Sequence, residues 1–382
     1  MLNIEVRGIG FPNKGAELML AAICHKLKRS GIKARIVLPP STAPYEQRAL
    51  YQAHQLAEFK KFGLNVGAIF RVVPTAIRRH LGIVLKSEID VILDASGFAY
   101  GDQWGAVKVR QRFNAYMRGF KNGKSSRRLI LMPQALGPFS DEAIKREMAK
   151  ILQAADLVFA RDPESLEHVE GIKNCSGNVF QAPDFTNLIQ PVYSQTIDMK
   201  DKRVCFIPNA KMMEMKQDEG HYLSFMAQLL RQAHEADLKP FVLVHEGRKD
   251  SQLAEDIITE AGCDVPVIKP DTATDVKALI GMSKLVVSSR FHGLVSALSQ
   301  NVPVMATGWS HKYRQLLSDY GIEDLLFDEK KDLGVAKEKM LLLGDGGEEY
   351  RRIKTLIAEY AGHEKQKSEA MWQRIFSVME NK

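Results

Sequence analysis

The stretch from Lys284 to Leu298 constrains the fold more than any other part of the chain, because it joins a strand pattern directly to a helix pattern. It reads KLVVSSRFHGLVSAL: an apolar, β-branched run ends in two serines, and an arginine and a histidine precede a helical pattern. An apolar run without alternation is typical of a strand buried on both faces of a parallel sheet. In an open α/β sheet, ligands bind at the carboxyl ends of the strands. We therefore expect Arg290 and His292 to lie at a ligand site.

A second strand-to-helix unit follows at once and points to the same site. Residues 302–306 read VPVMA, and Gly308, Trp309 and a helix that carries Lys312 come next. Unpaired N–H groups at the start of a helix favour an anion, and the nearby cationic side chains add positive charge. The two strand ends therefore predict a site for a small, multiply charged anion, with Ser289 among the contacts.

The strand-then-helix pattern recurs along the chain and predicts an α/β fold. Strands are expected at residues 2–6, 36–38, 90–94, 129–132, 157–160, 204–207, 241–244 and 265–268. The polar, aperiodic stretch 191–202 is interpreted as a linker between a first domain, residues 1–190, and a second, residues 203–382. Two βαβ halves of this kind predict two Rossmann-like domains that face each other across a cleft. The final helix, near residues 363–379, is a candidate to pack back on the first domain.

Composition places the chain among ordinary globular proteins. It has 382 residues, 45% hydrophobic and 26% charged, with a formal net charge of +7. This length accommodates two domains, and the diffuse positive charge suits anionic ligands or a membrane face without establishing either. The four cysteines are scattered, without the spacing of a metal site or a CxxC pair. Met1 leads directly into a strand and no apolar run approaches the roughly 20 residues that span a bilayer, so a cytoplasmic location is expected.

Two basic segments leave alternatives open. Residues 70–86 contain Arg71, Arg78, Arg79 and His80 among apolar side chains. This segment is either a solvated helix of the first domain or a surface that meets an anionic membrane or covers a lipid-linked substrate, in a peripheral contact at the inner face of the membrane. Residues 108–118 form a basic, aromatic-dotted helix, but no nucleic-acid-binding motif accompanies it, so we expect no nucleic-acid partner.

Three further loops follow predicted strands. Gly8 and Gly10 permit a tight turn near a ligand, although their spacing is not a full GxGxxG and a packing role is equally consistent. Asp162 is placed to cap a helix, with a proline at its first position. Arg161 either contacts a ligand or pairs with Asp162. His245 follows the strand 241–244, where it is either a phosphate ligand or simply a residue at the strand end.

Taken together and in order, the loops resemble the polysaccharide pyruvyl transferase family over roughly residues 1–320. The blocks that carry the resemblance are Gly8, Asn13, Gly15, Ala16 and Glu17; Asp90-Val91-Ile92 with Ser96-Gly97; Gln134 with Gly137-Pro138; Ala160-Arg161-Asp162 with Ser165; Ala182-Pro183-Asp184-Phe185; and Ser289-Arg290-Phe291-His292-Gly293, followed by Pro303 and Lys312. Departures from the family pattern are mild: Ala95-Ser96-Gly97 stands where many relatives carry a double glycine, and Phe291 where leucine is common.

The resemblance implies the two-domain GT-B fold shared with many glycosyltransferases. It also implies transfer of the enolpyruvyl group of phosphoenolpyruvate to a sugar of a cell-surface polysaccharide or its precursor, which closes a pyruvate ketal across two hydroxyls. Phosphoenolpyruvate would be the donor substrate, with no cofactor and no metal. The acceptor would be a sugar or a lipid-linked oligosaccharide. Substrate contacts would come from Arg290, His292, Lys312, Ser289, Arg161, His245, Gly15, Asn13 and Gln134.

The chemistry of the donor assigns roles within that set. Phosphoenolpyruvate carries a carboxylate and a phosphate, and the guanidinium of Arg290 can grip one of them. His292 is the predicted acid that protonates the methylene carbon, since an imidazolium can release its proton near neutral pH. A base for the sugar hydroxyl is expected from the first domain, and Glu17 and Asp94 are the candidates. Arg290, His292 and Lys312 all follow the linker, so the second domain is expected to hold the donor by itself.

Two other functions fit the same sequence. A GT-B glycosyltransferase that uses a nucleotide sugar would have the same fold and a similar basic site. A non-catalytic relative that binds sugar or phosphate would also keep the fold, although retention of both Arg290 and His292 argues against lost turnover. The donor that the protein uses would distinguish these alternatives.

Overall fold

The computed structural model describes residues 1–11, 13–58, 60–61, 64–117, 127–172, 177–191, 204–215, 220–308 and 310–380. It divides into two compact units, the first made of residues 1–11, 19–185 and 367–382 and the second of residues 12–18 and 186–366. The second unit therefore includes a short segment near the start of the chain, and the first unit includes its end. The predicted linker, residues 191–202, lies outside the described residues except for its first residue.

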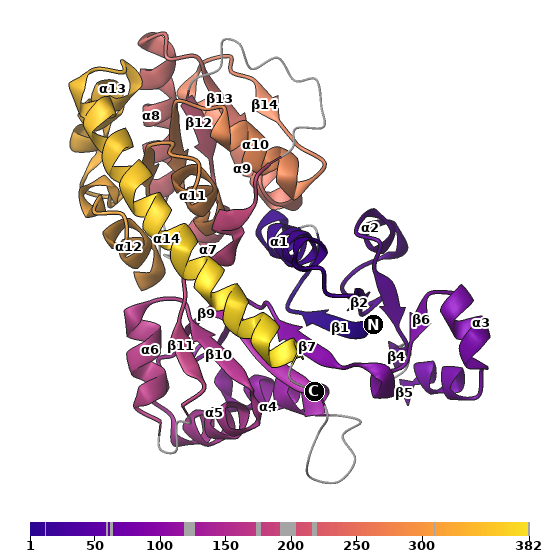
Figure 1. The fold of residues 1–382 in the computed structure, drawn as a ribbon. Helices are drawn as coiled ribbons and strands as arrows, with labels where there is room; N and C mark the ends of the chain where they lie inside the picture. Colours follow the sequence, from indigo (N-terminus) through magenta and orange to yellow (C-terminus); the bar gives the residue numbers. More distant parts are fainter. Residues whose placement is uncertain are drawn as a thin grey trace. The chain divides into compact units, whose positions relative to one another are not determined.

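The first unit is built on a parallel sheet whose strand order reverses at its centre (Figure 1). The order is β11-β10-β9-β7-β1-β2-β3-β6, with β8 paired to β9. The strands are β1 Leu2–Arg7, β2 Ala34–Leu38, β3 His54–Leu56, β6 Ile83–Val84, β7 Val91–Asp94, β8 Phe98–Tyr100, β9 Arg128–Leu136, β10 Leu157–Ala160 and β11 Val179–Gln181, beside a separate antiparallel pair, β4 Lys60–Lys61 and β5 Leu64–Asn65. The chain leaves the centre in one direction after β1 and in the other after β7, so the switch point of this sheet lies between these two strands.

Short helices connect these strands. They are α1 Lys14–Ser30, α2 Tyr45–Leu50, η1 Val66–Arg71, α3 Thr75–His80, η2 Lys86–Glu88, α4 Gly105–Met117, α5 Glu142–Ala154, α6 Pro163–Glu170 and η3 Phe185–Leu188. The first turn of α1 clusters with the second unit and the rest of α1 with the first.

The second unit has a parallel sheet of the same kind, in the order β14-β13-β12-β15-β16. The strands are β12 Val204–Ile207, β13 Pro240–Leu243, β14 Val267–Ile268, β15 Leu285–Ser288 and β16 Val304–Ala306. The helices are α7 Lys211–Met215, α8 His221–Glu235, α9 Gly247–Ala261, α10 Ala273–Gly281, α11 Phe291–Leu298, α12 His311–Ser318, η4 Glu323–Leu325, α13 Leu333–Gly344 and α14 Glu348–Glu380. Here the strand order reverses between β12 and β15.

Each unit buries its own apolar core. All four residues of β12, β13 and β15 are buried, as expected for strands covered on both faces. The end of α14 joins the core of the first unit through Trp372, whose ring packs edge-on against that of Phe185 with centroids 6.0 Å apart. Burial of one aromatic pair of this kind explains why the last residues cluster with the first unit.

The predicted elements are confirmed in kind and differ mainly in length. The strand predicted at residues 129–132 extends to Leu136, and the final helix begins at Glu348 rather than near residue 363. β14 is an edge strand, as the proline before it indicates. Within the basic segment 70–86, Arg78 is not part of a solvated or membrane-facing surface: its side chain is buried and pairs with Glu88.

Candidate functional site in the second unit

The switch point of the second sheet brings the residues after β12 and β15 together. The Asn209 side chain, after β12, donates to the Ser289 carbonyl at 2.9 Å. The Ser289 hydroxyl lies 2.8 Å from the Tyr222 hydroxyl and 2.7 Å from that of Thr307, and Ser289 is completely buried. Ser289 thus joins neighbouring segments inside the fold, which does not fit its predicted contact with substrate.

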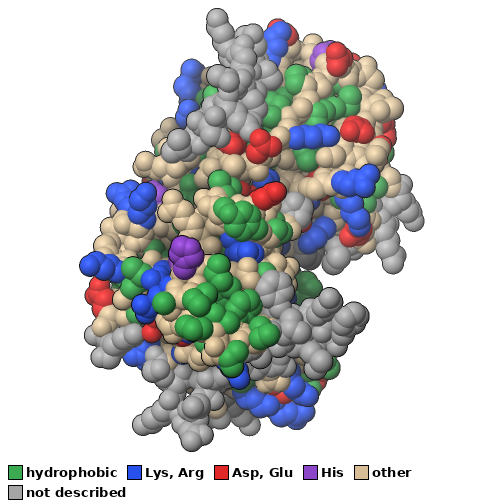
Figure 2. Space-filling view, turned by 90° about the vertical axis from the view of Figure 1, so that its right-hand side faces the viewer, with side chains coloured by type: hydrophobic (Ala, Val, Ile, Leu, Met, Phe, Trp, Pro, Cys, Tyr) green, Lys and Arg blue, Asp and Glu red, His purple; other side chains and the backbone are tan. Residues whose placement is uncertain are grey.

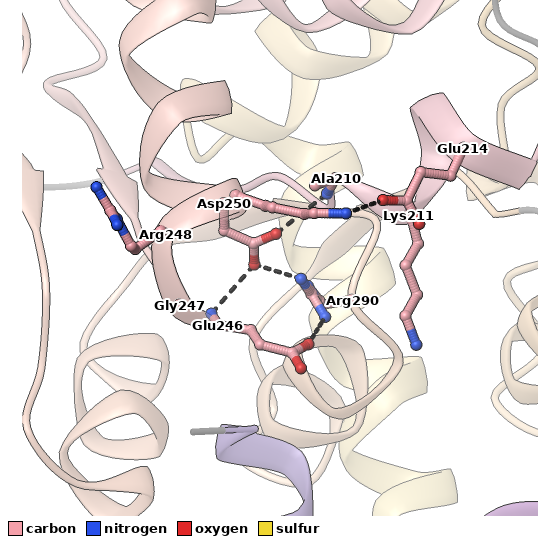
Figure 3. A pocket seen from close by; sticks show the side chains of 9 residues that line it. Ala210, Lys211, Glu214, Glu246, Gly247, Arg248, Asp250 and Arg290 are labelled. Carbon is pink, nitrogen blue, oxygen red and sulfur yellow. Dashed lines mark hydrogen bonds and ion pairs between the residues drawn. The ribbon is translucent and has the colours of Figure 1, made fainter. Parts of the chain in front are cut away.

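Arg290 follows Ser289, at the start of α11, and a clamp of two carboxylates holds its guanidinium. Nη1 of the guanidinium donates to the carboxylate of Glu246, and Nη2 donates to that of Asp250, as Figure 3 shows. The two acids lie four residues apart at the start of α9, so they present their carboxylates on one side of that helix. Asp250 also accepts from the backbone N–H groups of Ala210 and Glu246, each at 3.1 Å. We call Glu246 and Asp250 the carboxylate clamp.

Arg290 and the Asp250 side of the clamp are buried, whereas Glu246 is half-buried. Asp250 is 1% exposed and Arg290 8%. Burial raises the pKa of the Asp250 carboxyl above its usual value, while the charge of Arg290 and hydrogen bonds oppose that rise. An ion pair of this kind is costly to break from one side, because the remaining charge stays buried without its partner.

A cavity of about 260 Å³ opens beside the clamp (Figure 3). Its lining combines four cationic and three acidic side chains; the residues are Ala210, Lys211, Glu214, Glu246, Gly247, Arg248, Lys249, Asp250 and Arg290. Pockets for drug-sized ligands have about 300–1,000 Å³, so this one suits a smaller molecule. Lys249 pairs with Glu214 across the cavity at 2.5 Å.

His292 lies in the first turn of α11 and packs against the start of α1. A Cβ atom added to Gly15 would lie only 2.3 Å from Nδ1 of His292, so only glycine leaves room for the ring. On its other side the imidazole meets the Phe291 ring edge-on, with centroids 5.7 Å apart. The Lys312 ammonium lies over the Phe291 ring, 5.5 Å from its centroid. The structure thus brings His292, Gly15 and Lys312 to one end of α11.

The first turn of α1 supports this site with polar contacts as well. The Asn13 amide donates to Glu246 of the clamp at 3.2 Å, and its oxygen accepts from the N–H of Ala16 at 3.1 Å. Glu17 is 2% exposed, and both of its carboxylate oxygens accept hydrogen bonds. One oxygen accepts from the ammonium of Lys14 at 2.8 Å, and the other accepts from the backbone N–H of Ala273, at the start of α10, at 3.2 Å. A carboxylate buried at a helix start is stabilised there, a geometry that favours a structural role over that of a base.

His245, just after β13, is buried near Arg290, His292 and Lys14. Burial, reinforced by Arg290, His292 and Lys14, holds the pKa of its imidazole well below the usual value. The ring is therefore neutral near pH 7 and would approach a phosphate as a hydrogen-bond donor, without a charge.

The remaining predicted site residues belong to the first unit. Asp94, at the end of β7, is completely buried and accepts from the Tyr100 and Ser96 hydroxyls at 2.5 Å each. Burial and the Asp94 charge hold the pKa of Tyr100 and of Tyr116 well above the usual value, so these phenols stay protonated. The prediction that Asp94 is a base does not fit this geometry, because a sugar hydroxyl cannot reach its carboxylate.

Gln134, on β9, lies beside Arg161, which directly follows the neighbouring strand β10. The N–H of Arg161 donates to the Gln134 carbonyl at 3.0 Å, and an ion pair links the Arg161 side chain to Asp184 at 3.7 Å. Gln134 is completely buried, and its side-chain amide has no hydrogen-bond partner among the residues that the structure describes. A buried amide is normally satisfied, so that of Gln134 calls for a partner such as a water molecule or a ligand. Asp162 caps α6 through the N–H of Ser165 at 2.7 Å, as predicted.

Sequence reasoning did not include the carboxylate clamp, Lys211, Arg248 or Lys249 among the site residues. The only available signal was the position of Glu246 and Asp250 just after the strand at residues 240–243, at an edge where ligands bind. Among the described residues, no group of three or more His, Cys, Asp or Glu side chains could hold a metal ion, and no helix is long and apolar enough to cross a membrane.

Solved structures with the same fold include proteins that act on or bind nucleotide sugars. UDP-GlcNAc 2-epimerase from Neisseria meningitidis bound to UDP-GlcNAc is 11% identical, with 99% of this chain and 100% of that chain covered and a TM-score of 0.60. The S. aureus protein MnaA with UDP is 14% identical (99% and 97% covered, TM-score 0.59), and Anabaena HepE with UDP-glucose is 14% identical (99% of each chain covered, TM-score 0.57). At these identities the likeness establishes the GT-B-like fold of two Rossmann-like units and nothing more.

Sequence comparison identifies the family. A comparison with curated proteins finds no match. The family described as polysaccharide pyruvyl transferase matches residues 13–311, from the start of the α1 segment through the α11 site to the beginning of α12. The match spans well over half of the chain and includes Asn13, the carboxylate clamp, Arg290 and His292. This chain belongs to the polysaccharide pyruvyl transferase family.

Proposed function

We propose that this protein transfers the enolpyruvyl group of phosphoenolpyruvate to a sugar of a cell-surface polysaccharide or its precursor, forming a pyruvate ketal. The observation that carries the proposal is the placement of Arg290 and His292 at the switch point of the second sheet, within the segment matched by the family. In open α/β sheets, ligands bind at this switch point, outside the carboxyl ends of the strands. The cations around it suit a donor with both a carboxylate and a phosphate.

The reaction needs one proton delivered to carbon before the sugar can attack. His292 gives a proton to the methylene carbon of phosphoenolpyruvate, which becomes the methyl group and leaves the central carbon electrophilic. A first sugar hydroxyl bonds to that carbon, phosphate leaves, and a second hydroxyl closes the ketal. Of the two hydroxyl protons, one restores the acid and the other leaves with phosphate, so the reaction is balanced without a redox step.

Arg290 is suited to hold the donor rather than to exchange protons. Its guanidinium is charged at every accessible pH, and the carboxylate clamp fixes its orientation. Nε of Arg290 has no hydrogen-bond partner in the described part of the chain. The cavity beside Arg290 is also lined by Lys211, Arg248 and Lys249, which would compensate the negative charge of the donor. The ammonium of Lys312 and the ring of His292 both contact the ring of Phe291, so these two side chains lie near each other. Neutral His245 would add one hydrogen bond to the phosphate.

In the first unit, Gln134 and Arg161 are candidates to hold the acceptor sugar. The side-chain amide of Gln134 offers two donors and an acceptor, which suit sugar hydroxyls. Arg161 adds a fixed positive charge next to it. Neither Glu17 nor Asp94 is open to a sugar hydroxyl in the described structure, so this proposal assigns no base to them.

The test is a direct assay of the two donor classes. The protein is incubated with candidate glycans and either phosphoenolpyruvate or a nucleotide sugar, and the glycans are analysed by mass spectrometry alongside measurement of released phosphate. Addition of the pyruvyl mass with one phosphate per transfer supports the proposal. Addition of a sugar unit from the nucleotide sugar would instead make the protein a glycosyltransferase. Donor binding without any product would indicate a non-catalytic relative.

A further inference from the structure

We propose that an exposed surface on η1 and α3 of the first unit docks on an anionic phospholipid membrane. We call residues 69–81 the docking surface. Four of its large apolar side chains are exposed: Ile69 (67%), Val72 (81%), Ile77 (51%) and Leu81 (58%). This inference rests on residues outside the proposed transferase site and holds or fails independently of the reaction.

The apolar side chains are arranged as two pairs along the docking surface. Ile69 and Val72 lie three residues apart and are joined by a backbone hydrogen bond of 3.2 Å. Ile77 and Leu81 lie four residues apart, one turn of α3, and are likewise joined, at 3.0 Å. Residues at these spacings project from the same side of a helical turn. Four exposed apolar side chains within 13 residues of chain are more than the isolated apolar residues of an ordinary surface.

The charges around these side chains are of one sign. From residue 59 to residue 87 the sequence contains no aspartate or glutamate, and it contains six lysines and arginines. Arg71 and Arg79 are exposed within the docking surface itself. The acids on either side are already paired, Glu58 with Arg7 at 2.7 Å and Glu88 with Arg78 at 2.6 Å. This stretch of sequence is therefore apolar and basic, and the acids that flank it are engaged in ion pairs.

Arg78 holds the docking surface in shape rather than contacting a ligand. Its guanidinium reaches the two oxygens of Glu88, the carbonyl of Val73 at 3.2 Å and the hydroxyl of Thr75 at 3.1 Å. These contacts tie the turn before α3 to the segment after it. The buried arginine lets the neighbouring apolar and basic side chains face outward together.

Figure 2 is turned so that the side of Figure 1 that carries α3 faces the viewer. Its lower half shows hydrophobic side chains gathered on one face, with a histidine and several Lys or Arg side chains around them. Apolar side chains that enter the headgroup region, surrounded by basic side chains that meet anionic lipids, are the pattern of a peripheral membrane contact. Nucleic acid would match the charge but not the exposed isoleucine, valine and leucine.

The experiment measures binding of the full-length protein to vesicles by co-sedimentation. Vesicles of phosphatidylcholine are compared with vesicles that also contain phosphatidylglycerol, at low and high salt. We expect binding to the anionic vesicles that weakens as salt rises. The double variant Arg71→Gln/Arg79→Gln should lower the partition coefficient about thirtyfold, which corresponds to about 1 kcal/mol per basic residue. The variant Val72→Ser/Ile77→Ser should lower it about tenfold or more.

Matched controls come from the second unit, where Lys330→Gln/Lys331→Gln removes the same charge and Val335→Ser removes an equally exposed apolar side chain. These controls should bind as the parent does. Absence of binding to both kinds of vesicle, equal binding to both, or equal losses in the controls would overturn the proposal. A parent dimer that Val72→Ser/Ile77→Ser dissociates, without vesicle binding, would assign the surface to a second copy of this chain. Thermal melts of all variants confirm that the changes leave the fold intact.

Discussion

At the scale of single residues, Arg290 and His292 differ in what their chemistry allows. Arg290 is held by the carboxylate clamp and keeps its charge, whereas the imidazole of His292 can change protonation. We expect Arg290→Ala to raise the Michaelis constant for phosphoenolpyruvate about tenfold to a thousandfold, a loss of roughly 1.5–4 kcal/mol. His292→Ala should lower turnover about a hundredfold or more, with a smaller effect on donor affinity. Steady-state kinetics from pH 5 to 9 measure both.

The clamp adds a control to this comparison. Arg290→Ala leaves the buried carboxylate of Asp250 without its cation, so the variant is also expected to be less stable. Arg290→Lys keeps a charge for the clamp but not the planar fork, and separates lost folding from lost donor binding. If His292 only positions phosphate, the His292→Ala variant loses donor affinity and keeps the pH profile of the parent.

The contact between Gly15 and His292 gives a second prediction at this scale. A methyl group on residue 15 would overlap the imidazole, with the added carbon 2.3 Å from Nδ1. We expect Gly15→Ala to displace the ring and lower turnover about tenfold or more, with little change in the Michaelis constant for the donor. Gly10→Ala is the matched control, because an added Cβ there meets nothing within 4 Å. Equal turnover in the two variants would mean that the position of His292 does not limit the reaction.

At the scale of secondary-structure elements, the end of β13 carries a pH-dependent stability. Burial beside cations lowers the folded-state pKa of His245 below its unfolded value of about 6.5. Below about pH 6.5 the unfolded chain therefore takes up a proton that the folded chain does not, and folding stability falls as pH falls. One such group contributes a slope of at most about 1.4 kcal/mol per pH unit.

His245→Gln removes that group and should flatten the stability profile on the acid side. Urea midpoints of parent and variant are compared at intervals from pH 7.5 down to pH 5. The difference between them should narrow steadily below about pH 6.5 and stay constant above it. A constant difference over the whole range would mean that His245 takes up its proton equally well when folded.

The elements also mark the limit of what the sequence predicts. Strands such as β12, β13 and β15 were predicted because burial on both faces requires an unbroken apolar run. The position of Arg290 and His292 at a strand end followed from the same pattern. The clamp was not predicted, because Glu246 and Arg290 are 44 residues apart and meet only through the order of the strands. Burial of Arg78 was missed for a similar reason, since its partner Glu88 lies beyond the end of α3.

At the scale of the whole molecule, the division into units does not follow the sequence. The predicted boundary near residue 190 is close to the change of unit at residue 186, but residues 12–18 cluster with the second unit and residues 367–382 with the first. Nothing in the composition of these segments signals this exchange. Its cause is specific packing: Asn13 and Gly15 contact Glu246 and His292, and Trp372 packs on Phe185.

Because residues 12–18 belong to the second unit, the second half of the chain is no longer expected to form the complete donor site by itself. A fragment of residues 186–366 contains Arg290, His292 and the clamp but lacks the first turn of α1. Without it, Glu246 loses the hydrogen bond from Asn13, and the His292 ring loses the backbone against which it packs. If the fragment folds, we expect it to bind phosphoenolpyruvate at least about tenfold more weakly than the full chain, as for the loss of one charge-assisted hydrogen bond. Calorimetry or fluorescence titration measures the difference.

A variant of the full chain isolates this hydrogen bond from every other difference between the fragment and the full chain. Asn13→Ala removes only the amide that donates to Glu246. It should weaken binding of phosphoenolpyruvate about tenfold, since one hydrogen bond to a charged group contributes about 1.5–3 kcal/mol. If the fragment binds as tightly as the full chain, or if Asn13→Ala has no effect on donor binding, the first turn of α1 plays no part in holding the donor, and the second unit's site is complete without it.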